Sequence, residues 1–396
     1  MVGRDDMVTF EVGVILAFSL IVLSLILSSR LKIHYTLILV VLGACVASFR
    51  YFVGGQPSAF TGELILGLVL PTLVFQAALS IDFRILSEVK KRVFLLAIVG
   101  VLVSALVSTS LLVLLTPLAI LVALTFGVII SPTDAASVID AFKRLGVPHR
   151  LSTIVEGEAL LNDATAIVLF SAVMSLTLSP ILNIFRFGMV FGGGIIVGLG
   201  VAFVATRISQ LGSGPTYRIV LSMAVAYGAY AAAQALGFSG IVAVAIAGLF
   251  MSRGFQRNSE STRDLSFFWE IAAFTANAVA FLFLGLVADV GMIITYGALI
   301  VVCFVVVLVA RFVSVYSVSV VASRIEGKTP GSWQVVTALG GMRGAVSVAL
   351  ALSLPAGFAR DLIVTLTFGV AVISLVVQGS YLQAYVKRHA LEPTTG

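Results

Sequence analysis

Long apolar runs follow one another along almost the whole chain, and they point to a protein that crosses a membrane many times. Of the 396 residues, 60% are hydrophobic and only 11% are charged, and the mean hydropathy is +1.16. A water-soluble protein of this length could not hide so much apolar surface, whereas a bundle of membrane helices exposes it to lipid. The sequence therefore predicts an all-α polytopic membrane protein.

The apolar runs divide into about thirteen predicted spans. The ninth is short, and the fifth and twelfth are interrupted by helix-breaking residues. The predicted spans are 8–28, 34–49, 62–80, 93–115, 117–142, 152–178, 183–206, 216–236, 239–252, 265–288, 292–320, 332–354 and 361–386.

The basic residues support this count and orient the chain. With the N-terminus outside, alternation places 18 of the 24 lysines and arginines on the inner side and four on the outer side, and leaves Arg311 and Arg343 inside spans. The positive-inside rule expects such a bias. We therefore predict a multi-pass protein of the cell membrane with a cytoplasmic C-terminus. The net charge of +6 follows from this topology, so nucleic acid is not an expected partner, and no cofactor is expected.

Thirteen spans fit two six-helix halves of opposite orientation, joined by one linker span. Secondary transporters often contain such inverted repeats, with broken helices at equivalent positions. The fifth span of the first half breaks at Ser131, Pro132 and Thr133, and the fifth span of the second half contains GGMRG at 340–344. We predict discontinuous helices at both places. The inverted symmetry of the two halves is inferred from the spacing of the spans alone.

The first break is expected to create a polar site inside the membrane. The ring of Pro132 collides with the carbonyl one turn earlier, near Val128, and so frees carbonyls that could ligate a cation. Thr133 can cap the following half-helix, whose positive end favours the charged form of Asp134. A proline kink with a capping aspartate at the membrane surface is the alternative. The helical pattern of residues 135–146 favours an embedded Asp134.

The sixth predicted span carries three carboxylates within eight residues, at Glu156, Glu158 and Asp163. A charged residue near the bilayer centre costs about 2.5–3.5 kcal/mol on insertion scales, so such residues usually have a function. Glu158 and Asn162 share one helix face, because they are four residues apart. Glu156 is closest to the inner end and fits a solvated boundary residue, whereas Asp163 lies in the middle of the span.

Two arginines lie inside predicted spans and need partners, because a guanidinium group keeps its charge. Arg311 is in the eleventh span, and Glu158 is its natural partner. Arg343 lies among three glycines, where helix-end carbonyls could receive its N–H donors. A purely structural pairing of Arg343 is at least as well supported as direct ion handling.

Five segments, in this order, resemble the monovalent cation/proton antiporter superfamily, in the branch of NhaP-type and NHE-type sodium/proton exchangers. They are SPTDAASV, GEALLNDATAIVLF, FWEIAAFTANAVAFLFLGL, GGMRGAVSVALAL and VVQG. The resemblance covers nearly the whole chain. It implies a homodimer whose protomers have a mobile six-helix core with two crossed broken helices, here about 93–178 and 292–386, and a dimerisation scaffold, here about 8–80 and 183–288.

The resemblance also implies roles for the residues of the ion site. Asp163 resembles the aspartate of the family's Asn-Asp motif, which binds either the ion or the proton, and Asn162 would be its partner. Asp134 and the backbone of Thr133 would complete the Na+ site from the unwound helix.

Other matching positions have supporting roles. Glu158 and Arg311 would form a buried bridge that holds the core together, and Arg343 would stabilise the second break. Glu270 and Asn277 match family positions in the tenth span.

Two positions depart from the family pattern. Gln76 stands where many relatives have a glutamate or aspartate, and Ala159 stands where archaeal relatives often have serine. Both positions could line the ion site. Their identity here leaves fewer oxygen ligands and one less charge, which affects ion preference and not the class of transport.

The predicted function is electroneutral exchange of one Na+, or Li+, for one H+, in sodium transport and pH homeostasis. Burial disfavours the charged form of a carboxyl group, so Asp163 could bind either a proton or a cation. Glu158 stays ionised against Arg311, and Asp134 stays ionised near a helix N-terminus. Asp163 is then the group that exchanges a proton for a cation.

Three other functions fit some of these features. K+/H+ exchange is the alternative within the transport class. An intramembrane aspartyl protease also needs two membrane aspartates, but the YD and GxGD motifs of that family are absent. A channel is the third alternative, although a buried Glu–Arg bridge and a pair of broken helices suit alternating access better.

Overall fold

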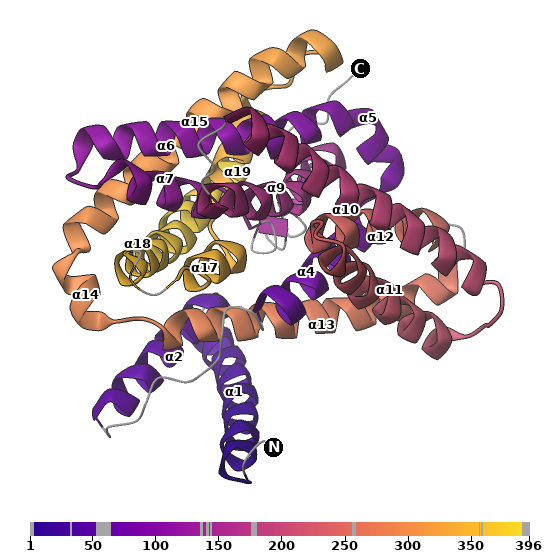
Figure 1. The fold of residues 1–396 in the computed structure, drawn as a ribbon, viewed down its shortest axis with the longest axis horizontal. Coiled ribbons are helices and arrows are strands. Elements are labelled where there is room, and N and C mark those ends of the chain that lie inside the picture. Colours follow the sequence, from indigo (N-terminus) through magenta and orange to yellow (C-terminus); the bar gives the residue numbers. More distant parts are fainter. Residues whose placement is uncertain are drawn as a thin grey trace.

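The fold is a bundle of helices, seen in a computed structural model (Figure 1). The structure describes residues 4–31, 34–52, 65–134, 138–139, 142, 145–175, 180–255, 259–355, 357 and 359–389. Within these ranges there are helices and connecting turns and no strand. This agrees with the predicted class, because a backbone inside lipid must satisfy its own hydrogen bonds, which a helix does.

The helices follow the predicted spans closely. Through the first part of the chain they are α1 (Arg4–Leu31), α2 (Tyr35–Phe52), the π-helical η1 (Ile65–Val69), α4 (Leu70–Ser80), α5 (Phe83–Phe94), the π-helical η2 (Leu95–Gly100), α6 (Val101–Leu115), α7 (Ile120–Ile129), α9 (His149–Ser175) and α10 (Pro180–Ile208). The rest are α11 (Pro215–Ala235), α12 (Gly240–Phe255), α13 (Ser259–Leu286), α14 (Val290–Thr295), α15 (Gly297–Glu326), α16 (Gly331–Leu339), α17 (Ala345–Leu352), α18 (Arg360–Ile373), the π-helical η3 (Ser374–Gln378) and α19 (Gly379–Arg388).

About thirteen membrane segments account for these helices. Among the described residues, seven helices are long and apolar enough to cross a membrane, and four shorter apolar helices accompany them. Several helices run past the predicted ends. One begins at Phe83 and not at residue 93, because Asp82 caps it by accepting a hydrogen bond from the backbone N–H of Arg84 at 2.8 Å. The predicted ends at residues 62 and 178 lie outside the described residues.

Both predicted helix breaks are present. The helix α7 ends at Ile129, and residues 131–134 are not helical. In the second half of this span, residues 138–139 and 142 are helical, and the remainder up to 142 lies outside the described residues. The helices α16 and α17 are separated by residues 340–344. The two broken helices therefore occupy the positions that the sequence predicts.

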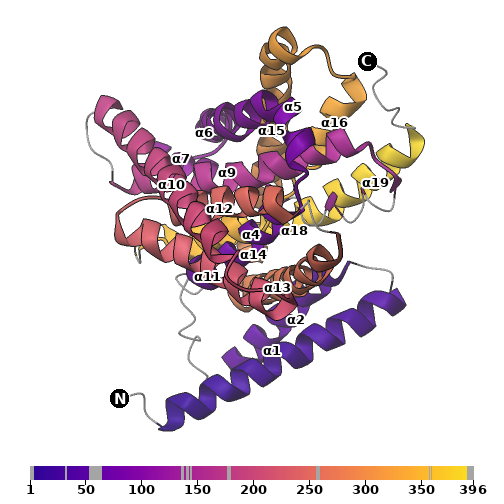
Figure 2. The same ribbon diagram turned by 90° about the vertical axis from the view of Figure 1, so that its right-hand side faces the viewer.

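Burial shows which helices form the centre of the bundle. The most apolar window of α9 is 67% buried, the largest share among the seven long helices, whereas that of α1 is 11% buried. Leu160 and Ala164 of α9 belong to one hydrophobic cluster, and Ala159 and Leu161 belong to another. The helix α1 runs along the edge of the bundle beside α2 (Figure 2). The helix with the acidic motif therefore lies between the two halves of the core.

Candidate functional site

The two helix breaks meet at the centre of the candidate site. The backbone N–H of Asp134 donates a hydrogen bond to the carbonyl of Met342 at 2.8 Å, so each break supplies a partner for the other. Gly344 is packed directly against the side chain of Asp134, and a Cβ at Gly344 would collide with the Cβ of Asp134. The glycine in the second break therefore makes room for a carboxylate in the first.

Arg343 connects the second break to the carbonyls of the first. Its side chain is 1% exposed, and Nη1 donates to the carbonyls of Ser131 at 2.9 Å and Pro132 at 3.0 Å. The sequence suggests helix-end carbonyls as acceptors, and in the structure these are carbonyls of the first break. A permanent positive charge thus lies against the backbone that Pro132 leaves without helical hydrogen bonds.

The carbonyl one turn before Pro132 is also engaged. Val128 O accepts from the backbone N–H of Ser131 at 3.2 Å and from its hydroxyl at 2.8 Å. The carbonyls of Val128, Ser131 and Pro132 therefore all accept hydrogen bonds. The backbone of Thr133 stays a predicted ligand, together with the side-chain oxygens of the site.

Ser374, at the start of η3, is a residue that sequence reasoning missed. Its buried hydroxyl accepts from the backbone N–H of Arg343 at 3.1 Å and donates to the carbonyl of Ala371 at 2.8 Å. It therefore fixes the backbone of Arg343 against α18. A single serine in an apolar span gives no signal of this contact, because many helical serines bond only to their own helix.

Asn162 and Thr133 join the acidic helix to the first break. The Nδ2 of Asn162 donates to the hydroxyl of Thr133 at 2.7 Å, and both side chains are buried. Oδ1 of Asn162 is buried too, and it has no hydrogen-bond partner within the described part of the chain. A buried acceptor without a partner is costly. The amide is therefore held so that its oxygen can serve a ligand.

Asp163 and Asp134 supply the carboxylates of this arrangement. Both residues are of intermediate burial, whereas Thr133, Asn162 and Arg343 are buried. The two carboxylates lie near enough to interact electrostatically. Hydroxyl, amide and carboxylate oxygens are the ligands that hard cations prefer. Among the described residues no cluster of three or more His, Cys, Asp or Glu could hold a transition metal.

Glu158 and Arg311 form an ion pair with two hydrogen bonds. Nη1 of Arg311 bonds to Oε1 of Glu158, and Nη2 donates to Oε2 at 2.9 Å and to the carbonyl of Thr337 at 3.0 Å. The side chains of Glu158 and Arg311 are 1% and 4% exposed. The pair therefore ties α9 to α15 and, through Thr337, to α16.

The remaining sequence-based candidates lie in other settings. Gln76 donates to the hydroxyl of Ser80 on its own helix at 3.0 Å, and Ala159 is buried in a hydrophobic cluster. Their contribution to the ion site stays a prediction. Glu270 is exposed, and Asn277 donates to the hydroxyl of Tyr35 at 3.3 Å.

Comparison with known proteins finds a family and relatives that all concern sodium/hydrogen exchange. Residues 15–388 match the family model for "Sodium/hydrogen exchanger, transmembrane". The Na(+)/H(+) antiporter ApNhaP of Aphanothece halophytica is 33% identical, over 98% of this chain and 76% of that protein. The Na(+)/H(+) antiporter NhaH of Halobacillus dabanensis is 34% identical, over 82% of both chains.

A solved structure shares the fold. The sodium proton antiporter MjNhaP1 from Methanocaldococcus jannaschii, solved at pH 8, superimposes with a TM-score of 0.77 at 21% identity, covering 95% of this chain and 99% of that one. A second structure of the same antiporter, from an electron-microscopy map, has a TM-score of 0.80 at 23% identity.

Proposed function

The chain belongs to the sodium/hydrogen exchanger family, in its NhaP-type branch, and on that premise we propose that it exchanges Na+ for H+ across the cell membrane. This family consists of transporters, so the protease alternative does not apply. The similar proteins are Na(+)/H(+) antiporters, which favours Na+ over the K+ alternative. Li+ is proposed as a second cation. Sodium transport and pH homeostasis are the processes that this exchange would serve.

The observation that carries the proposal is the setting of Asp163. Asp163 follows directly after Asn162, whose Nδ2 is fixed by Thr133 and whose buried Oδ1 has no hydrogen-bond partner among the described residues. A cation bound at Asp163 and Asp134 would give that oxygen a partner. A proton on Asp163 would instead neutralise the carboxylate, so the two ligands exclude each other on charge grounds.

We propose that the exchange is one for one. Glu158 accepts two hydrogen bonds from Arg311 in a buried ion pair, and in this proposal it takes no part in the proton cycle. Asp134 has no part in the proton cycle either, as the sequence predicts. Asp163 is left as the group that carries either H+ or the cation, so no net charge crosses the membrane in a full cycle.

The movement that we propose is alternating access by the core. Its helices, about 93–178 and 292–386, contain both breaks and the Glu158–Arg311 bridge, so the site would move as a unit against the scaffold helices at about 8–80 and 183–288. Bilayer-facing side chains such as Ile15, Phe18 and Val22 on α1 are 66%, 53% and 56% exposed, and part of such a face would be covered in a homodimer. The N-terminus is proposed outside and the C-terminus in the cytoplasm, from the distribution of basic residues.

Purified protein in liposomes that contain a pH-sensitive dye tests this function. A gradient of Na+ or Li+ is expected to drive proton flux, and a matched gradient of K+ or Rb+ is expected to drive much less. An imposed membrane potential is expected to leave the rate and the end point unchanged. Proton flux that K+ drives as well as Na+ would favour the alternative exchanger, and a current that persists through turnover would contradict one-for-one exchange.

A further inference from the structure

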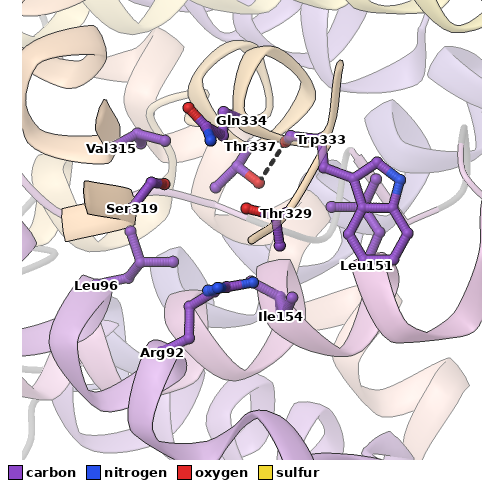
Figure 3. A pocket seen from close by; sticks show the side chains of 10 residues that line it. All are labelled: Arg92, Leu96, Leu151, Ile154, Val315, Ser319, Thr329, Trp333, Gln334 and Thr337. Carbon is purple, nitrogen blue, oxygen red and sulfur yellow. Dashed lines mark hydrogen bonds between the residues drawn. The ribbon is translucent and has the colours of Figure 1, made fainter. Parts of the chain in front are cut away.

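A small pocket lies next to the loop at residues 327–330, between α5, α9, α15 and α16 (Figure 3). In this view Arg92 reaches into the pocket from one side, and Thr329 and Thr337 lie on the opposite side. The indole of Trp333 forms a further wall. The space open to the centre of a water-sized sphere is about 10 Å³, so the pocket holds one water or one small ion.

Arg92 is a buried cation that is only partly satisfied. Its side chain is 5% exposed. Nη2 donates to the carbonyl of Gly327 at 3.0 Å, whereas the buried Nε has no hydrogen-bond partner, and Arg92 makes no ion pair with any residue that the structure describes. A guanidinium group cannot lose its charge to relieve this situation. A buried charge of this kind is expected to have a counter-charge.

The charges around the pocket leave it positive. Within the described chain none of the residues that line the pocket is acidic. Glu326 interacts electrostatically with Arg92; its Oε1 accepts the backbone N–H of Lys91 at 3.0 Å, and its buried Oε2 has no hydrogen-bond partner among the described residues. Arg150 adds a second positive charge close to Arg92. One carboxylate therefore faces two guanidinium groups, and that carboxylate is not part of the pocket wall.

We propose that this pocket binds a single monovalent anion of the size of chloride or bromide, with Arg92 as its main partner. The hydroxyl of Thr329 and the amide of Gln334 line the same space and can donate hydrogen bonds. Leu96 and other apolar side chains complete the wall, which suits weakly hydrated halides. A phosphate or a carboxylate-bearing molecule exceeds the space for one ion.

The pocket is connected to the buried ion pair through one residue. The side chain of Thr337 lines the pocket, and its hydroxyl donates to the carbonyl of Trp333 at 2.8 Å. The carbonyl of Thr337 accepts from Nη2 of Arg311 at 3.0 Å. An anion beside Arg92 would therefore brace the same helix that helps to hold Arg311. Bound halide is expected to stabilise the folded protein.

Fluorescence quenching tests the site, because heavy halides quench an indole that they touch. The chain has two tryptophans; Trp269 lies in a different hydrophobic cluster and donates to Ser222. In a Trp269→Phe variant, Trp333 is the remaining emitter. When bromide replaces gluconate at constant ionic strength, the emission is expected to fall along a saturating curve. Adding Arg92→Gln is expected to turn this curve into a shallow straight line, as for random collisions.

Two comparisons make the result decisive. Arg324→Gln, at an exposed arginine near the end of α15, is expected to leave the saturating curve unchanged. In the unsubstituted protein, bromide in place of gluconate is expected to raise the melting temperature by roughly 1–3 °C near saturation, which tests the site even if Arg92→Gln does not fold. Linear quenching with equal slopes with and without Arg92, or an unchanged melting temperature, would overturn the proposal.

Discussion

Asp163→Asn is expected to reduce Na+-driven proton flux in liposomes to the level of protein-free vesicles. The amide keeps the size of the side chain and can accept a hydrogen bond, but it can neither take up a proton nor supply a negative charge to a cation. Asn162 and Thr133 stay bonded to each other in the variant, because their contact does not involve Asp163. The protein should therefore elute as the same folded species and melt near the temperature of the unsubstituted chain.

Glu156→Gln is the matched control for this variant. Glu156 lies on the same helix, is partly exposed and accepts a hydrogen bond from Ser152 at 2.6 Å. This variant removes a carboxylate from α9 and leaves Asp163 in place, so most of the flux should remain. Substantial exchange by Asp163→Asn, measured beside this control, would remove Asp163 from the centre of the mechanism.

Breaking the pair of Glu158 and Arg311 from one side is expected to cost about 3–5 kcal/mol of folding free energy, because the partner is left as an unpaired buried charge. Each single change, Glu158→Gln or Arg311→Met, should lower the melting temperature in detergent strongly. The double variant should lose less than the sum of the two, since neither buried charge is then left alone. Both side chains are almost fully buried, so solvent screening hardly weakens the effect.

Glu270→Gln serves as the comparison for the pair. Glu270 is exposed, and a surface change of this kind is expected within about 0.5 kcal/mol of the unsubstituted chain. If the losses from Glu158→Gln and Arg311→Met simply add in the double variant, the two groups do not depend on each other and the bridge has no role in holding the core.

The features that the sequence predicts well are those that the bilayer dictates. Apolar length predicts the helices, and Pro132 and the glycine-rich segment at 340–344 predict the breaks, because both disrupt helices deep in apolar spans. The partner of Arg311 could be named as well. A permanent charge inside a membrane needs a counter-charge, and the chain offers few buried carboxylates at a suitable depth.

The features that the sequence could not predict depend on how the two breaks cross. Arg343 donates to Ser131 and Pro132, and Gly344 makes room for Asp134. These contacts join segments about 200 residues apart in the sequence. The contact of Ser374 with the backbone of Arg343 is equally hidden. The resemblance to a known family supplied the meeting of the broken helices, and the structure supplied the donors and acceptors.

The most direct test of the central claim, that Asp163 binds H+ and Na+ in turn, is proton release on sodium binding. Na+ is added to purified protein in weakly buffered detergent solution, and the released protons are counted against bound cation, with choline as the control. We expect one proton for each Na+ bound by the unsubstituted chain and none from Asp163→Asn. Sodium binding without proton release, or the same release from Asp163→Asn, would contradict the account.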